Sequence, residues 1–310
     1  MKYIPDADVP GLPIASVERE TGLSKDTLRV WERRYGFPTP GRDANGERLY
    51  ALAQVRALSR IKRLMDRGHR PGKLLALDEA ALSALDALGD TRAVTHVDAP
   101  LDEWMRLVRQ HDTEGLTRQF HSEIAKRGLA SFVQDVVAPL ITRVGEAWSR
   151  NEIGIFEEHL FSEHLKKLFR TTLSNMAPQT GSPRILLTTL SGEEHTLGLL
   201  MVEALLTVED AYPLTLGPQT PIDEIVRAAQ LKQVDAVCLS FSSAYAGALA
   251  AQGLRDLRQA LPAQVALWAG GYGVKAIRKP IEGVCLLSEF GDLYACLGGW
   301  KQERGGKSAD

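Results

Sequence analysis

The chain has 310 residues, enough for two or more domains of ordinary size. Hydrophobic residues make up 44% and charged residues 25% of the chain, which excludes a largely disordered polypeptide. No segment approaches the roughly 18 consecutive apolar residues of a membrane helix, and residues 1–13 do not resemble a secretory signal. We therefore expect a globular, multidomain protein of the cytoplasm.

Three cysteines occur, Cys238, Cys285 and Cys296, and they lie far apart in the sequence. Their odd number and wide spacing predict neither a disulfide framework nor a zinc cluster. Such cysteine usage is typical of a reducing compartment.

The net charge of −2 conceals an uneven distribution along the chain. Residues 1–75 carry 15 Lys and Arg against 9 Asp and Glu, whereas the remaining residues carry 22 against 30. A basic segment joined to an acidic body predicts that the basic segment alone contacts a polyanion.

The first predicted domain, residues 12–77, consists of short helices. Ser24 follows a glycine turn and is a favourable N-cap for a helix over 25–35. Glycines and prolines over 36–41 end that helix, and a further helix is expected over 52–67. A helix, a tight turn and an arginine-bearing helix form the layout of a helix-turn-helix that reads the major groove.

The candidate DNA contacts are basic or small polar side chains, because arginine reads guanine and small polar groups reach phosphate. They are Lys25, Thr27, Arg29, Arg33, Arg34 and Arg42. The alternative interpretation is a solvated, charged helix face without a ligand.

Residues 29–36, Arg-Val-Trp-Glu-Arg-Arg-Tyr-Gly, and the segment Gly-Glu-Arg-Leu-Tyr over 46–50 resemble the winged helix-turn-helix of the MerR family. The resemblance implies that Arg48 and Tyr50 of the wing contact the DNA backbone. It also implies a homo-oligomer, a dimer or a tetramer, on a two-fold operator. The long dimerisation helix of that family is not evident, so the source of dimerisation stays open.

The rest of the chain is predicted as a linker, a helical domain and an α/β domain. Residues 78–100 are rich in Ala, Leu and Asp and read as a linker, and 101–180 read as a helical-bundle cap domain. Short apolar runs alternate with helical patterns over 181–302, which predicts a doubly wound, Rossmann-like parallel sheet. Residues 303–310 are expected to form a disordered tail.

Strands are expected at 185–190, 234–239, 265–269 and 284–287. Helices are expected at 196–207, 222–231, 246–261 and 293–300. Ligands of such sheets bind at the carboxyl ends of the strands.

The sequence Glu-Glu-His over 193–195 follows the first of these strands, where a histidine would be exposed at the ligand edge. A neutral imidazole is a good transition-metal ligand, and Glu193 could orient the ring of His195 through its other nitrogen. Gly198 would let the following helix approach closely. One histidine suffices only for a metal that a macrocycle already holds.

The pattern Glu-x-His-x-x-Gly over 193–198 resembles the lower-ligand motif of cobalamin-binding domains. The resemblance extends to small residues at two other strand ends, which would line the nucleotide tail: Ser240, Ser242, Gly270 and Gly271. Ser242 stands where the family pattern Ser-x-Leu has leucine.

Trp148, followed after nine residues by Glu158 and His159, resembles a signature of CarH-type photoreceptor regulators, in which the helical domain caps adenosylcobalamin. The resemblance covers residues 12–300 and implies a DNA-binding regulator, a repressor rather than an enzyme, controlled by adenosylcobalamin and light. Ser149 replaces a histidine that can bind cobalt in that family.

Two other interpretations remain open from the sequence. The regulator could sense another tetrapyrrole, such as haem or biliverdin, or no ligand at all. The chain could instead be a cobalamin-dependent methyltransferase subunit, although its basic first domain argues against this.

Overall fold

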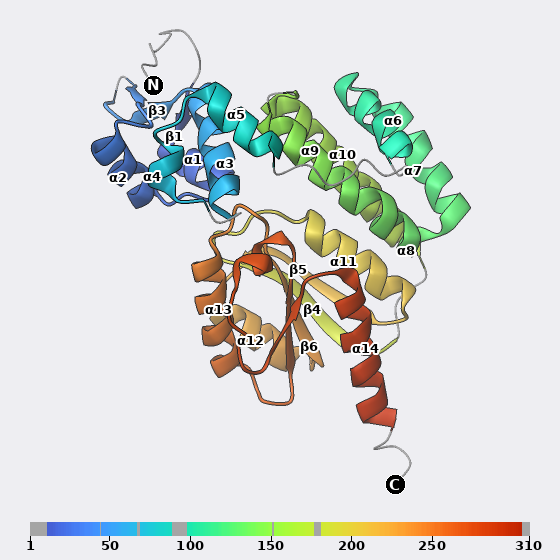
Figure 1. Ribbon diagram of the computed structural model, residues 1–310. Helices are drawn as coiled ribbons and strands as arrows, with labels where there is room; N and C mark the ends of the chain where they lie inside the picture. Colours follow the sequence, from blue (N-terminus) through green and yellow to red (C-terminus); the bar gives the residue numbers. More distant parts are fainter. Residues whose placement is uncertain are drawn as a thin grey trace. The chain divides into compact units, whose positions relative to one another are not determined.

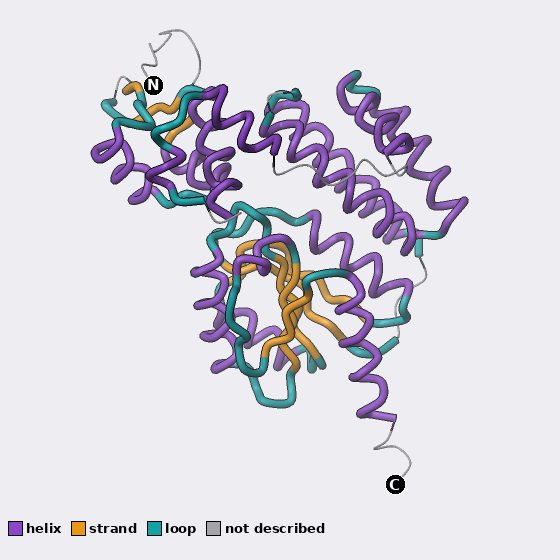
Figure 2. The backbone as a smooth tube through the Cα atoms, viewed as in Figure 1, coloured by secondary structure: helices purple, strands orange, loops and turns teal. Residues whose placement is uncertain are grey.

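The computed structural model describes residues 11–43, 45–66, 69–88, 98–150, 152–176 and 181–305. By their internal contacts, the residues form two compact units, Met1–Glu103 with Thr142–Glu158, and Trp104–Ile141 with His159–Asp310. Figure 1 labels the helices and strands, and Figure 2 distinguishes them by type. No helix among the described residues is long and apolar enough to cross a membrane.

The first part of the chain, here called the head, is described over residues 11–43, 45–66 and 69–88. These residues form five helices and a small antiparallel sheet. The helices are α1 (Ile14–Thr21), α2 (Lys25–Tyr35), α3 (Leu52–Asp66), α4 (Pro71–Leu74) and α5 (Glu79–Leu88). The strands β1 (Leu12–Pro13), β2 (Gly41–Arg42) and β3 (Arg48–Tyr50) pair in the order β1-β3-β2. The expected N-cap is confirmed, because Ser24 Oγ accepts a hydrogen bond from the Thr27 amide at 3.1 Å.

Helix α5 lies in the stretch that the sequence predicts to be a linker. Leu82 is only 2% exposed and belongs to the same core as Leu58 and Trp31, with Leu85 packed against it. The linker prediction is therefore wrong for α5, since burial of its leucines makes this helix part of the head. Residues 89–97 of the expected linker lie outside the described residues.

The middle of the chain is helical, as the sequence predicts. It comprises α6 (Asp98–Arg109), α7 (Thr113–Arg127), α8 (Leu129–Phe132), a π-helical turn η1 (Val133–Val137), α9 (Ala138–Ser149) and α10 (Ile155–Ser174). Three phenylalanines fix the packing of α7, α8 and α10. The Phe120 ring meets Phe132 and Phe169 edge to face, with centroids 4.8 Å and 5.6 Å away.

The last part is a five-stranded, fully parallel sheet in the order β5-β4-β6-β7-β8, which confirms the predicted fold class. Its strands are β4 (Arg184–Leu190), β5 (Tyr212–Thr220), β6 (Ala236–Ser240), β7 (Ala266–Gly270) and β8 (Val284–Leu287). Its helices are α11 (Leu197–Val208), α12 (Ile222–Leu231), α13 (Gly247–Ala260), the 3-10 turn η2 (Tyr272–Ala276) and α14 (Phe290–Gly305).

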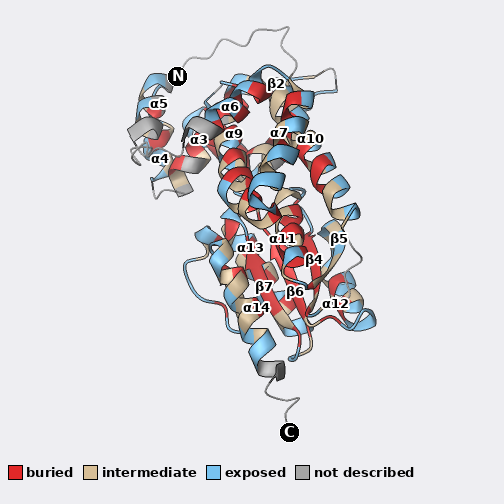
Figure 3. Cartoon of the chain, turned by 90° about the vertical axis from the view of Figure 1, so that its right-hand side faces the viewer, coloured by how far each residue is buried: buried red, intermediate tan, exposed pale blue. Residues whose placement is uncertain are grey.

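Helices cover both faces of the sheet: α12 and α13 lie on one side, and α11 and α14 lie on the other (Figure 1). Leucine, valine and alanine fill the strands, so β4, β6 and β7 are buried (Figure 3). The sequence did not reveal β5, the edge strand. Residues 303–305 of the expected tail belong to α14, and 306–310 lie outside the described residues.

We predict that Phe120→Ala lowers the free energy of unfolding by about 3–5 kcal/mol, because it removes a fully buried ring and its edge-to-face contacts with Phe132 and Phe169. Urea unfolding followed by circular dichroism measures the change. Leu231→Ala is the matched control in the same unit: Leu231 is 71% exposed, and its loss should change stability by no more than about 0.5 kcal/mol. Equal unfolding midpoints for the two variants would contradict the assigned core.

Candidate functional site

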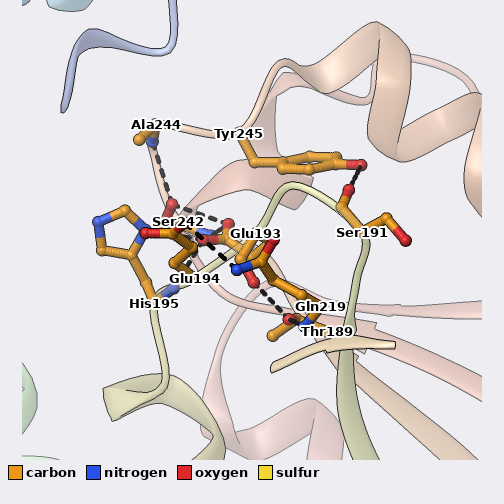
Figure 4. A network of polar contacts seen from close by, with 9 residues as sticks. All are labelled: Thr189, Ser191, Glu193, Glu194, His195, Gln219, Ser242, Ala244 and Tyr245. Atoms are coloured by element: carbon orange, nitrogen blue, oxygen red, sulfur yellow. Dashed lines mark hydrogen bonds and ion pairs between the residues drawn. The ribbon is translucent and has the colours of Figure 1, made fainter. Parts of the chain in front are cut away.

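The loop between β4 and α11 places two charged or titratable side chains at the carboxyl end of the sheet. Gly192 turns the chain with a φ of 87°, a backbone conformation that favours glycine. The Glu193 side chain then points inward and is 1% exposed, whereas the His195 side chain points outward and is 54% exposed. Figure 4 shows these residues with their neighbours.

Both carboxylate oxygens of Glu193 accept hydrogen bonds. Oε1 lies 2.7 Å from His195 Nδ1 and 3.0 Å from the backbone nitrogen of His195. Oε2 accepts hydrogen bonds from the backbone nitrogen of Ser242 at 2.7 Å and from its Oγ at 2.8 Å (Figure 4). Burial alone would raise the pKa of Glu193, but these hydrogen bonds and the charge of His195 lower it below the ordinary value.

This arrangement fixes how His195 can act. A carboxylate accepts from Nδ1–H, which assigns Nε2 as the nitrogen that can coordinate a metal. Among the described residues, no group of three or more His, Cys, Asp or Glu side chains could hold a metal ion. The donor set therefore fits one axial ligand to a metal held in a macrocycle, and a corrinoid cobalt is such a metal.

Further polar residues support the same loop, and the sequence analysis missed them. Thr189 Oγ1 donates to the Glu193 carbonyl oxygen at 2.6 Å and accepts from the backbone nitrogen of Gln219 at 2.8 Å. The Gln219 amide donates to Glu194 at 3.2 Å, and the Tyr245 hydroxyl donates to the Ser191 carbonyl oxygen at 3.2 Å. Of these residues, only Thr189 could have been inferred from the sequence, because it lies on the strand that directly precedes the loop.

The structure brings the other predicted strand-end residues together. Ser240 of β6 pairs with Gly270 of β7. Ser242 lies two residues after Ser240, and Gly271 directly follows Gly270. A Cβ on Gly198 would lie 2.4 Å from Ser240 Oγ, so a larger residue would displace the Ser240 hydroxyl where α11 approaches β6. The resemblance implies that Ser240 lines a nucleotide tail; in the structure Ser240 is in contact with Gly198 and is 8% exposed.

A pocket of about 390 Å³ borders the His195 loop at Thr196. It lies between α10, α11 and β5, and its walls combine leucines with polar side chains. Thr215 donates to Glu203 in this pocket at 2.9 Å, and burial raises the pKa of Glu203. The remaining lining residues are Arg170, Leu173, Ser174, Leu199, Leu200, Gly217 and Pro218.

The predicted capping residues lie on two helices. Trp148 is partly buried near the end of α9, and Glu158 is partly buried near the start of α10. His159, the next residue of α10, is exposed.

In the head, helix α2 presents most of the predicted DNA-contact side chains. Arg29 and Arg33 are exposed, and Arg29 Nη1 lies 3.4 Å from Asp26. The exposed Arg34 guanidinium lies 5.2 Å from the Tyr35 ring centroid. Lys25 forms an ion pair with Glu18 at 3.4 Å, and Thr27 Oγ1 lies at hydrogen-bond distance, 2.8 Å, from the Ser24 hydroxyl. Both interactions stabilise the turn between α1 and α2.

The wing differs from the expectation at one residue. Arg42 donates to the Gly46 carbonyl oxygen at 2.6 Å, and Arg48 pairs with Glu32 of α2 at 2.9 Å. Tyr50 is 0% exposed in the head core, and its hydroxyl has no hydrogen-bond partner among the described residues. The prediction that Tyr50 contacts DNA is therefore wrong, because the strand turns its ring inward to pack on the helices.

Comparisons with known proteins agree with this architecture. Residues 12–74 match the MerR HTH family regulatory protein model, and residues 100–171 match the B12 binding domain model. The chain is 28% identical to the HTH-type transcriptional repressor CarH of Myxococcus xanthus over 82% of its length and 87% of that protein. It is 29% identical to the repressor CarA of the same organism, over 87% of this chain and 90% of that protein.

A solved structure shares the fold. The monomethylamine corrinoid protein of Methanosarcina barkeri aligns over 66% of this chain and 99% of its own, at 16% identity and a TM-score of 0.50. This likeness shows that the two chains share a fold, and the B12 binding domain model itself matches the helical residues 100–171. The chain is therefore a MerR-type helix-turn-helix regulator with a B12-binding domain, and a distant homologue of the CarH and CarA proteins over most of its length.

Proposed function

We propose that this protein is a transcriptional repressor that binds operator DNA through α2 and the wing and binds a cobalamin with His195 as the lower cobalt ligand. The observation that carries the cofactor assignment is the buried Glu193 carboxylate, which holds His195 through Nδ1 and the Ser242 loop through Oε2. Ligating histidines are commonly oriented in this way by a carboxylate.

The proposed cofactor is adenosylcobalamin, which would supply a cobalt–carbon bond that light can break. In this proposal the Trp148 ring offers a flat apolar face, while Glu158 and His159 offer hydrogen-bonding groups to the adenosyl side. Ser240, Ser242, Gly270 and Gly271 adjoin the nucleotide tail. The contact between Gly198 and Ser240 would have to loosen to admit that tail.

The DNA contacts proposed for the head are the exposed arginines Arg29, Arg33 and Arg34, with Lys25 and Thr27 at the start of the helix. Arg42 and Arg48 are the proposed contacts of the wing. Ligand binding would control DNA affinity by favouring a homo-oligomer that presents two or more heads, since linked binding sites gain affinity by avidity. Occupancy of the B12-binding domain would thereby set occupancy of the operator.

The alternatives receive less support from the site. A bilin needs no metal ligand and would leave the paired arrangement of Glu193 and His195 without a purpose. The methyltransferase interpretation leaves the helix-turn-helix of residues 12–74 without a role. Haem stays a competitor because its iron also accepts an axial histidine, so haem belongs in the binding test.

We predict that His195→Ala abolishes or strongly weakens binding of adenosylcobalamin in the dark, measured by calorimetry and by retention during gel filtration. Glu193→Gln should weaken binding by about 10–100-fold, because an amide has one accepting oxygen, whereas the two carboxylate oxygens accept hydrogen bonds from His195 and from Ser242. His121→Ala, which removes an exposed histidine of α7, is the control. Thermal melting verifies that each variant folds. Unchanged affinity in His195→Ala, or preferential binding of haem or biliverdin, would refute the assignment.

We predict that Arg33→Ala weakens binding of the full chain to its preferred duplex by about 1–3 kcal/mol, the usual value of a lost base contact. The duplex is obtained by selecting a random-sequence library on the full chain, and affinity is measured by fluorescence anisotropy. Arg118→Ala removes the same charge from an exposed position of α7, outside the head, and serves as the control. If both variants bind as tightly as the parent chain, Arg33 is not in the interface.

Control by light is tested on the same duplex. The chain loaded with adenosylcobalamin in the dark should lose at least about tenfold in DNA affinity after green illumination, because the loss of an oligomer removes avidity. A sample loaded with hydroxocobalamin should show no difference between dark and light. Equal affinities of the adenosylcobalamin sample would exclude light control while leaving the cobalamin assignment intact.

A further inference from the structure

The three cysteines, which the sequence separates widely, gather on one face of the sheet. Cys238 of β6 and Cys285 of β8 both lie opposite Trp268 of the intervening strand β7. Cys296 is in the second turn of α14, the helix that packs on β8. The wide spacing of the cysteines in the sequence conceals this proximity, which arises because the chain turns back on itself between β8 and α14.

Cys285 and Cys296 are in direct contact. Their Sγ atoms are 2.7 Å apart, and both residues are partly exposed to solvent. A disulfide requires a sulfur–sulfur distance of about 2.05 Å, so bond formation needs only a small adjustment of the two side chains. Cys238 differs from this pair: it is 2% exposed, and burial raises its pKa to about 12, which makes it an inert thiol.

We propose that Cys285 and Cys296 are a redox-active dithiol, which a peroxide oxidises to an intramolecular disulfide between β8 and α14. This modification site is independent of the proposed cobalamin ligand. The bond would lock the first turns of α14 against the edge of the sheet. Leu287, two residues after Cys285, pairs with Gly270, so the crosslink adjoins one of the strand ends described above.

One molecule of hydrogen peroxide is the oxidant and accepts the two electrons that the thiols lose. The Cys285 thiolate attacks a peroxide oxygen, the oxygen–oxygen bond breaks, and a sulfenic acid forms with release of one water after protonation. The Cys296 sulfur then attacks the Cys285 sulfur, the sulfur–oxygen bond breaks, and a second water leaves. The two thiols thus lose two electrons and two protons, and hydrogen peroxide becomes two molecules of water.

The two sulfurs are in contact at 2.7 Å, and the directions of their pKa shifts favour Cys285 as the attacking sulfur. A hydrogen bond from the Cys296 thiol lowers the pKa of Cys285 against the opposing effects of burial and Asp292, whereas the pKa of Cys296 is raised by that hydrogen bond and by burial. The thiolate, which is the nucleophilic form, therefore develops first on Cys285.

The test treats the reduced, full-length chain with hydrogen peroxide and counts thiols in denaturant with Ellman's reagent. Three thiols are expected before treatment and one after it. No Lys or Arg separates Cys285 from Cys296 in the sequence, so one tryptic peptide carries both. That peptide should become lighter by about 2 Da, the two hydrogens lost from the thiols, and a thiol reductant should reverse the change.

Variants separate the possible outcomes. Cys238→Ser should form the disulfide like the parent chain, whereas Cys296→Ser should instead accumulate a Cys285 sulfenic acid that dimedone traps. Because these are small changes, a thermal melt compares the fold of each variant with that of the parent. The proposal is overturned if both thiols of the parent persist under peroxide, if each is oxidised separately, or if the crosslink joins two chains.

Discussion

The buried carboxylate of Glu193 is the interaction on which the candidate site depends. An ionised group that is 1% exposed is stable only when its charge is fully hydrogen-bonded. Here the partners come from two loops, because His195 follows β4 and Ser242 follows β6. These strands are adjacent in the sheet, and the chain leaves them toward helices on opposite faces. The carboxylate therefore joins the two sides of the topological switch point, where α/β sheets bind ligands.

Much of this fold could be predicted because its signals are local. Strands β4, β6 and β7 are almost fully buried and β8 is partly buried, and each is a short apolar run whose length and flanking turn residues identify it. Strand β5 carries Pro213, Gly217 and Pro218, and its pairing with β4 is interrupted by register shifts. An edge strand tolerates such residues, so its sequence resembles a loop.

Helix α5 and Tyr50 could not be predicted correctly from local sequence, because burial in the core of the head determines where they lie. The segment 79–88 has little polar patterning, so its sequence does not show that its leucines pack into the core of the head. Tyr50 lies in a motif that the sequence associates with DNA, yet β3 directs its ring into that core. A single sequence gives residue types, but not the direction in which a short strand faces.

The site was predictable to the extent that its partners are neighbours in sequence. Glu193 and His195 are two residues apart, so the chemistry of the pair can be inferred directly from the motif. Ser242 and Gln219 reach the same loop from other strands, and the distances between them in sequence conceal those contacts. The meeting of Cys285 with Cys296 is hidden for the same reason, since it depends on the angle at which α14 returns to β8.

The ion pair between Arg48 of the wing and Glu32 of α2 has a consequence for how the head discriminates among polyanions. In the unbound head the guanidinium already has an anionic partner at 2.9 Å, and that partner raises its pKa. An arginine that meets a phosphate from this position exchanges one anion for another, so the net gain is the difference between the two attractions. Such a residue contributes little to nonspecific binding of polyanions. In the proposed DNA complex, Arg48 would therefore favour a duplex whose shape brings a phosphate closer to the guanidinium than the Glu32 carboxylate is.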